Sequence, residues 1–282
     1  MDKLLTISSS YRTKGNGEVL LDLCENFLSE SQYNKKRLYL RDFSIKTCTG
    51  CMGCAINKEF CKIEDDLRKL IDQILISDVL IISAPVYFLG ASSITKAIGD
   101  RLLGIHNLLD YSKRKPAGII ITAGREEWEG LAIQNLSILL LSLGFYIKDV
   151  LVAHGQGPSE VVLDPDIKNK IEIFTKNIAN PDYKVPNISN KCPVCFGESF
   201  NILDKSRIKC AICNLSGEII GNNDEILISF PEDAINNSRW SADNLKDHME
   251  NWVEGSIKRY KEKIREIMKL RNSIKVSINR PK

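Results

Sequence analysis

The first 180 residues of the chain alternate short apolar runs with amphipathic segments. The apolar runs have the length and the β-branched content of buried strands, and they cover residues 4–8, 36–40, 79–83, 118–122 and 146–152. The segments between them have helical periodicity, near residues 18–28, 65–76, 94–103, 131–143 and 167–178. This alternation predicts an α/β domain in which helices cover both faces of a parallel sheet.

Five such strands suit a doubly wound, flavodoxin-like parallel sheet with the strand order 2-1-3-4-5. In sheets of this kind, ligands bind at the carboxyl ends of the strands, beside the point where the strand order reverses. The loops that follow the strands are therefore where we look for functional residues.

Four cysteines are concentrated in one stretch with the spacing C-x2-C-x2-C-x6-C, namely Cys48, Cys51, Cys54 and Cys61. Two-residue gaps let the backbone curl so that successive sulfurs point at neighbouring corners of a cubane cluster, and Gly50 and Gly53 ease that curl. A zinc site usually draws two ligands from each of two separate knuckles. The spacing therefore favours a [4Fe–4S] cluster over zinc and over a loop of unligated cysteines.

Four further cysteines form two C-x2-C pairs, namely Cys192, Cys195, Cys210 and Cys213. The gap between the pairs fits a short hairpin, which is typical of a zinc ribbon or a rubredoxin-like site. We expect left-handed backbone after the pairs, at Gly197 and Asn214. Zinc is favoured over iron, because a rubredoxin would show glycine directly after each pair. The remaining cysteine, Cys24, is expected to be a core residue of a helix.

The sequence predicts three units. Residues 1–180 form the flavodoxin-like domain with the cysteine loop 48–61, residues 191–230 form the zinc ribbon with a turn at 221–224, and residues 239–275 form a helical tail. Residues 180–190, rich in Pro and Asn, are expected to be a linker.

Ser241 is expected to cap the first tail helix, whose Leu245, Met249 and Trp252 share a face. The second tail helix has an apolar side of its own, formed by Ile257, Tyr260, Ile264, Ile267 and Met268. Both helices are expected to pack on the domain or on a neighbouring subunit.

Composition predicts a cytoplasmic protein. Hydrophobic residues make up 43% and charged residues 27%, as in soluble globular proteins. No segment resembles a membrane span, and the amino terminus has no signal-peptide core. Ligand-type cysteines in such a chain indicate metals in a reducing compartment rather than disulfides. The tail is basic, which suits a solvated helix face or an acidic partner such as a ferredoxin.

The loop after the first strand, SSSYRTKGNG, opens a helix. Hydroxyls and backbone N–H groups in such a loop form a nest for a dianionic phosphate. The candidate donors are Ser8, Ser10, Arg12, Asn16 and Gly17. Neither G-x-x-x-x-G-K-[ST] nor G-x-G-x-x-G is present, so the loop does not indicate a nucleoside triphosphate or a Rossmann-type dinucleotide.

The loop after the third strand, SAPVYFLG, offers an apolar wall and backbone amides that suit an isoalloxazine ring. Its candidate contacts are Pro85, Val86, Tyr87 and Phe88, although the two aromatic residues would also suit the core. The loop after the fourth strand begins with Ala123 and Gly124 and is placed to close over the ring or the phosphate.

These motifs, in this order, resemble the NADPH-dependent FMN reductase group of flavodoxin-like proteins, and within it the iron–sulfur flavoproteins. SSYRTKGNG is similar to the family's phosphate loop GSPRxxGNT, CKIEDDL to C-x-[IV]-x-D-D-[ML], SAPVYF to SPVYF, and KAIGDR to K-x-x-x-D-R. The last match places Lys96, Asp100 and Arg101 on the helix behind the ring loop. The resemblance covers residues 1–178 and leaves out the ribbon and the tail.

The resemblance implies bound FMN, a flavodoxin-like fold and a homodimer or homotetramer. The phosphate loop departs from the family pattern, because Ser9 and Tyr11 replace its Gly and Pro. Gly17 replaces its terminal Thr, so one hydroxyl contact to the phosphate is lost. The family also includes members whose cysteines in this loop hold no cluster.

Flavin and cluster together predict an oxidoreductase that passes electrons from ferredoxin or NAD(P)H to an unknown acceptor. The alternatives are an NAD(P)H:FMN or quinone-type reductase without a cluster, and a redox or oxygen sensor whose zinc ribbon binds a partner. Nucleic-acid binding is disfavoured, because the ribbon is poor in basic and stacking residues. No catalytic side chain is expected, since His106, His154 and His248 are isolated. Cluster and flavin are expected to be neighbours, within one chain or across a subunit interface, because the cysteine loop follows the second strand on the same edge of the sheet as the phosphate and ring loops.

Overall fold

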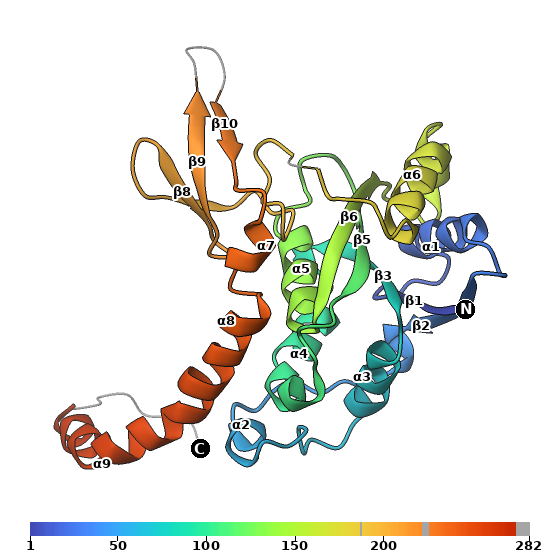
Figure 1. Ribbon diagram of the computed structural model, residues 1–282. Coiled ribbons are helices and arrows are strands. Elements are labelled where there is room, and N and C mark those ends of the chain that lie inside the picture. Colours follow the sequence, from blue (N-terminus) through green and yellow to red (C-terminus); the bar gives the residue numbers. More distant parts are fainter. Residues whose placement is uncertain (187, 222–225, 275–282) are drawn as a thin grey trace.

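The computed structural model describes residues 1–186, 188–221 and 226–274. It consists of an α/β domain and a small antiparallel sheet that continues into C-terminal helices (Figure 1). None of the helices in this described part combines the length and the apolarity that crossing a bilayer requires.

The α/β domain is built on five long parallel strands: β1 (Asp2–Ser8), β2 (Tyr33–Tyr39), β3 (Val79–Tyr87), β5 (Lys115–Ala123) and β6 (Phe145–His154). They pair in the order β2-β1-β3-β5-β6, which confirms the predicted flavodoxin-like topology. The two-residue strand β4 (Gly90–Ala91) pairs antiparallel with the end of β3. The register of β1 and β3 places Ser8 beside Ser83, at the carboxyl edge where the strand order reverses.

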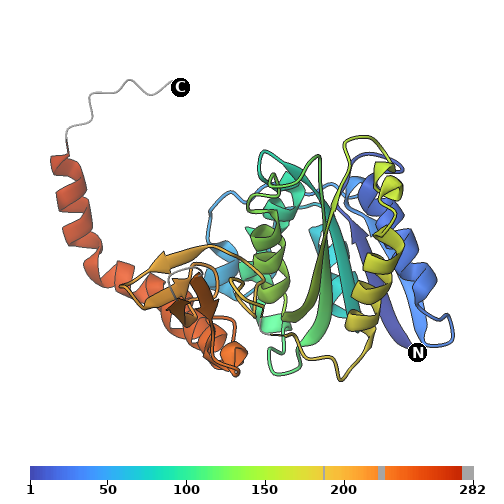
Figure 2. The same cartoon turned by 90° about the horizontal axis from the view of Figure 1, so that it is seen from above.

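Helices cover both faces of the sheet (Figure 2). On one face lie α1 (Asn16–Phe27) and α6 (Ile167–Ala179), and on the other lie α3 (Leu67–Leu75), α4 (Ser93–Gly99) and α5 (Ala132–Ser142). In α3, apolar side chains at helical spacing supply the buried stripe. Cys24 of α1 is fully buried, as predicted, and burial raises the pKa of its thiol to about 12.

Some boundaries of strands and helices differ from those predicted from the sequence. Strand β2 begins at Tyr33 rather than at residue 36. The helix predicted at 94–103 ends as α4 at Gly99 and continues, after a break, as the 3-10 helix η2 (Leu102–Leu108). The break turns Arg101 inward, where its side chain is fully buried.

The small sheet has four antiparallel strands, β7 (Phe200–Ile202), β8 (Arg207–Cys210), β9 (Ser216–Gly221) and β10 (Ile226–Ser229), in the order β10-β9-β8-β7. The predicted turn at 221–224 falls mostly outside the described residues. The ribbon packs on α5, where Ser137 Oγ donates a hydrogen bond to the Cys195 carbonyl at 2.8 Å. Val194 and Phe196 join the core on the same side of the domain.

After the short helix α7 (Ala234–Asn237), the C-terminal segment runs from the ribbon along the domain as α8 (Ala242–Asp247), the π-helix η4 (His248–Glu254) and α9 (Gly255–Ser273). Ser241 caps α8, as predicted, by accepting the Asn244 N–H at 3.3 Å. Met249 is buried, but Trp252 is 63% exposed. The predicted shared face is therefore broken, because a π-helical turn holds more residues than an α-helical one and shifts those beyond it.

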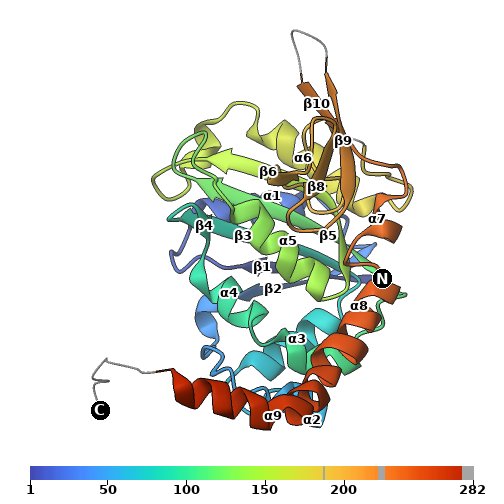
Figure 3. The same cartoon turned by 90° about the vertical axis from the view of Figure 1, so that its left-hand side faces the viewer.

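The second tail helix, α9, buries none of its residues against the described part of this chain. Its predicted apolar side is thus partly exposed, whereas η4 before it contacts the domain. That π-helix contacts the short helix α2 (Gly53–Asn57), which lies within the cysteine loop. In Figure 3 the C-terminal segment runs down from the ribbon and ends in α9, which crosses the bottom of the view in front of α2.

Candidate flavin and metal sites

A pocket of about 300 Å³ lies at the carboxyl edge of the sheet, where the strand order reverses. Four loops line it, and the lining residues are Ser10, Arg12, Gly15, Asn16, Gly17, Pro85, Val86, Tyr87, Thr122, Gly124, Gly155, Gln156, Gly157 and Pro158. The site thus lies where a doubly wound sheet is expected to bind its ligand.

Most of the predicted contacts meet in this pocket: Ser10, Arg12, Asn16, Gly17, Pro85, Val86, Tyr87 and Gly124. Three others lie elsewhere. Ser8 and Ala123 are buried inside their strands and do not line the pocket. Phe88 is fully exposed and lines a neighbouring pocket instead.

The loop after β6, residues 155–158, is the part of the pocket that sequence analysis missed. It is fastened to the phosphate loop, because Asn16 Nδ2 donates to the Gly155 carbonyl at 2.8 Å and Arg12 Nη1 donates to the Gln156 carbonyl at 3.3 Å. The signal in the sequence was HGQGP, a glycine-rich stretch directly after the fifth strand. Asn16 therefore ties two loops together in addition to lining the pocket.

The amino-terminal end of α1 approaches the sheet closely beside the pocket. A Cβ atom at Gly17 would collide with Ser83 Oγ and would lie 3.2 Å from Ser83 Cβ. Ser8 Oγ and Ser83 Oγ are buried and find no hydrogen-bond partner within the described ranges. Glycine at this position is therefore required by the contact between helix and strand.

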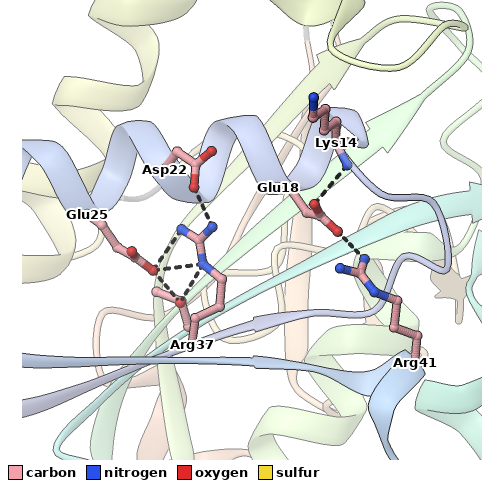
Figure 4. Close-up of polar contacts among 7 residues, drawn as sticks. Lys14, Glu18, Asp22, Glu25, Arg37 and Arg41 are labelled. Carbon is pink, nitrogen blue, oxygen red and sulfur yellow. Dashed lines mark hydrogen bonds and ion pairs between the residues drawn. The ribbon is translucent and has the colours of Figure 1, made fainter.

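An ion-pair network neutralises the acid in the first turn of α1 (Figure 4). Glu18, which is nearly buried, is paired with Arg41 and accepts the Lys14 backbone N–H at 2.9 Å. Arg41 also donates to the Arg12 carbonyl at 3.2 Å, so it supports the phosphate loop directly. Figure 4 also shows a second group, in which Arg37 of β2 binds Asp22 and Glu25 of α1.

With Glu18 neutralised, the Arg12 guanidinium and the amino-terminal end of α1 leave this part of the pocket electropositive. A helix amino terminus carries a partial positive charge and unpaired N–H groups, which favour a phosphate. The donor set therefore fits a phosphate monoester, and the loop at 85–87 supplies an apolar wall next to it.

A second pocket of about 430 Å³ adjoins the first and shares Val86 and Gly124 with it. The other lining residues are Phe88, Leu89, Arg125 and Trp128. Phe88 and Leu89 have left-handed backbones, with φ of 48° and 62°. Their turn is held by the Leu131 N–H, which donates to the Leu89 carbonyl at 2.6 Å.

His154 is not isolated, and the prediction that it would be is wrong. Its Nε2 lies 2.5 Å from Glu129 Oε1, which joins the end of β6 to the loop after β5. Burial alone would raise the pKa of Glu129, but the hydrogen bond and charge of His154 and two backbone N–H groups together outweigh burial and lower that pKa. The pair braces two loops that both line the candidate flavin pocket.

The four ribbon cysteines form a compact, buried group. Their sulfurs lie within 4.8 Å of one another, and the Sγ atoms of Cys195 and Cys210 are 3.6 Å apart. With a metal–sulfur distance of about 2.3 Å, a tetrahedral ion needs sulfurs about 3.8 Å apart. Phe196 and Asn214, the residues directly after each pair, are left-handed, with φ of 56° and 58°. Asn214 confirms the expectation, whereas Phe196 takes the place expected for Gly197.

The cysteines of the loop 48–61 are spread more widely. Cys48 and Cys51 are exposed, while Cys54 and Cys61 are partly buried. Within the described ranges they do not form a group close enough for a single ion, whereas a cubane cluster holds its thiolates further apart. Cys54 and Cys61 pack against Gly104 of η2, where a Cβ would come within 2.8 Å of the Cys61 nitrogen.

Within one chain, this loop does not bring the cluster site next to the flavin pocket, which leaves the expected arrangement across a subunit interface. Its helix α2 packs against η2 and η4, and none of the four cysteines lines the pocket. The physical reason is that the chain, after β2, runs from the edge of the sheet along the α3 and α4 face. Within one chain, the two sites are therefore separated.

Together, the sheet and its edge pocket define the class of flavodoxin-like flavin oxidoreductases. The chain belongs to the NADPH-dependent FMN reductase family, whose family model matches residues 3–157. It is 28% identical over 176 residues to an iron–sulfur flavoprotein of Archaeoglobus fulgidus, over 62% of this chain and 78% of that protein. It is 26% identical over 134 residues to the iron–sulfur flavoprotein MJ1083 of Methanocaldococcus jannaschii, over 48% of this chain and 69% of that protein. The chain is a flavin-dependent oxidoreductase.

A solved structure named flavone reductase has the same fold over the whole chain. It superposes with a TM-score of 0.70 at 17% identity, over 99% of this chain and 100% of that chain. At this level of identity the similarity concerns the fold, and it extends through the ribbon and the C-terminal helices.

Proposed function

We propose that this protein binds FMN in the pocket at the carboxyl edge of the sheet and transfers electrons from NAD(P)H or a ferredoxin to an acceptor. The observation that carries the proposal is the pocket itself, where an electropositive helix end and an apolar wall lie side by side. FMN, once bound, exchanges electrons singly or in pairs, whereas an iron–sulfur cluster passes one at a time.

The residues of the pocket have separate tasks in this proposal. Arg12, Ser10 and the first N–H groups of α1 bind the phosphate. Pro85, Val86 and Tyr87 form the wall against which the ring rests, and Gly124 leaves room for it on the other side. Asn16 and the His154–Glu129 pair hold the surrounding loops in place.

We further propose that Cys48, Cys51, Cys54 and Cys61 ligate a [4Fe–4S] cluster. The spacing of the four cysteines supports this proposal, and so does the similarity to archaeal iron–sulfur flavoproteins. Within one chain the loop lies away from the pocket, so a homodimer or homotetramer is the arrangement in which a second copy would bring the two cofactors together.

The ribbon is proposed to bind one zinc ion through Cys192, Cys195, Cys210 and Cys213. Their burial and close spacing fit a structural ion with no open position for a substrate. The ribbon then stabilises the face of the domain that carries α5.

A reductase without a cluster is the second candidate. The exposure of Cys48 and Cys51 and the separation of their loop from the pocket favour it. Both candidate functions require bound flavin, but only the first requires a protein that contains labile sulfide.

The test is cofactor analysis of protein purified without oxygen. We expect acid-released flavin that runs as FMN, one zinc per chain, and iron and sulfide in the ratio of a cubane cluster. FAD in place of FMN would contradict the flavin assignment. Zinc and FMN without sulfide would instead identify the second candidate. Turnover with NAD(P)H or with reduced ferredoxin then identifies the donor.

A further inference from the structure

Arg101 forms a fully buried ion pair with Asp65. The Arg101 side chain is 0% exposed and the Asp65 side chain 1% exposed. Arg101 Nη2 donates to Asp65 Oδ1 at 3.2 Å, and Nη1 donates to Oδ2 of the same carboxylate. Such a fork-to-carboxylate pair fixes both the position and the orientation of the guanidinium.

The same guanidinium holds both ends of the cysteine loop. Arg101 Nη1 donates to the carbonyl of Lys46 at 3.1 Å, and Nη2 donates to the carbonyl of Ile63 at 3.3 Å. Asp65 also accepts the backbone N–H of Lys46, at 2.8 Å. Because Lys46 precedes Cys48 and Ile63 follows Cys61, all four cysteines lie between the two fixed points.

Cys61 lies close to this guanidinium in the fold, because its backbone packs against Gly104, three residues after Arg101, and Ile63, two residues after Cys61, accepts from Arg101. The Nε–H of Arg101 is buried and has no hydrogen-bond partner among residues 1–186, 188–221 and 226–274. A buried donor without a partner is costly, and a sulfur ligand is the acceptor at hand. Hydrogen bonds to ligand sulfurs are among the features that set the reduction potential of a cluster.

We propose that Arg101, held by Asp65, is the positioning residue of the cysteine loop: it fixes both ends of the loop and donates a hydrogen bond to Cys61, so that the four sulfurs meet one iron–sulfur cluster. The inference rests on the proposed function, because it requires a cluster in this loop. It adds to that function a residue that assembles the cluster site and tunes its potential.

The test compares Arg101→Gln and Arg101→Lys with Lys96→Gln, all purified without oxygen. Lys96 is a matched control, because it lies on α4, five residues before Arg101, in an exposed ion pair with Asp100. Iron, sulfide, FMN and zinc per chain are measured, together with the thermal midpoint and the reduction potential of the cluster.

Arg101→Gln should lose more than half of the iron and sulfide while it keeps FMN and zinc. Arg101→Lys keeps the charge but not the planar fork, so it should retain more cluster, with a reduction potential shifted to more negative values. Lys96→Gln should match the wild type in both cluster content and reduction potential. A merely structural ion pair would change the thermal midpoint without changing the potential.

Wild-type cluster content in Arg101→Gln, or an unchanged reduction potential in Arg101→Lys, would overturn this inference but leave the proposed function intact. Should Arg101→Gln lose FMN and zinc through unfolding, the potential of Arg101→Lys decides the matter in either direction. A wild-type protein without labile sulfide would overturn the proposed cluster and the inference with it, so the two failures are distinguishable.

Discussion

The hydroxyl of Ser92 donates a hydrogen bond to the hydroxyl of Ser9 over 2.8 Å, and both side chains are buried. The bond ties the loop after β1 to the start of α4, and the far end of that helix leads into Arg101. The seven residues of α4 rise about 10 Å along the helix axis. One short helix therefore connects the candidate flavin pocket to the cysteine loop and fixes their separation within a chain.

Gly17→Ala should destabilise the protein by about 1–3 kcal/mol, because the new methyl group collides with Ser83 where α1 meets β3. Adding Ser83→Ala should recover part of the loss by removing the hydroxyl. Urea unfolding measures both effects. Gly99→Ala is the control, since a methyl group there meets nothing within 4 Å and should be neutral or mildly stabilising. Equal stability of Gly17→Ala and wild type would contradict the contact.

Arg41→Gln should weaken FMN binding about tenfold, or about 1.4 kcal/mol, because it leaves the Glu18 carboxylate unpaired near the phosphate site. Titration of the metal-replete apoflavoprotein with FMN, followed by flavin fluorescence, measures the dissociation constant. Lys36→Gln removes an exposed charge from β2, five residues before Arg41, and should have no effect. The same affinity for both variants would show that Glu18 does not act on the phosphate.

Cys192→Ser should abolish stoichiometric zinc and unfold the ribbon, because structural zinc contributes on the order of 10 kcal/mol to such a module. FMN should be retained, since no ribbon residue lines the flavin pocket. Metal analysis and limited proteolysis of residues 191–230 measure the two effects. The control is Cys24→Ala, which removes a buried thiol outside the metal group and should keep the zinc. One zinc per chain in Cys192→Ser would refute the site.

Glu129 should stabilise the protein in a pH-dependent manner. Its pKa lies below the ordinary value of 4.5, so the ionised carboxylate is favoured by folding. The contribution is complete above pH 4.5 and is lost as the pH falls through the lowered pKa. The difference in thermal midpoint between wild type and Glu129→Gln should therefore be constant near neutrality and shrink below pH 4.5. A difference in thermal midpoint that grows as the pH falls would mean that folding raises the pKa of Glu129, and it would contradict this prediction.

The parallel sheet and the order of its strands were predictable, because strand and helix periodicity are carried by residues close together in the chain. The ribbon cysteines were predictable for a similar reason, since the two residues of each knuckle are neighbours in sequence. Trp252 shows the limit of this reasoning, because a π-helix, which is set by tertiary packing, moved it to the surface.

The sequence by itself determined the fold class, indicated the loops of the candidate flavin pocket and singled out two sets of ligand-type cysteines, because each follows from a short, local pattern. Only the tertiary structure decided the rest. Arg101 and Asp65 are 36 residues apart, His154 and Glu129 25, and Arg12 and Gln156 144. Whether such pairs meet depends on how strands and helices pack. The sequence around a single charged residue or a glycine-rich loop does not indicate which distant residue it will contact.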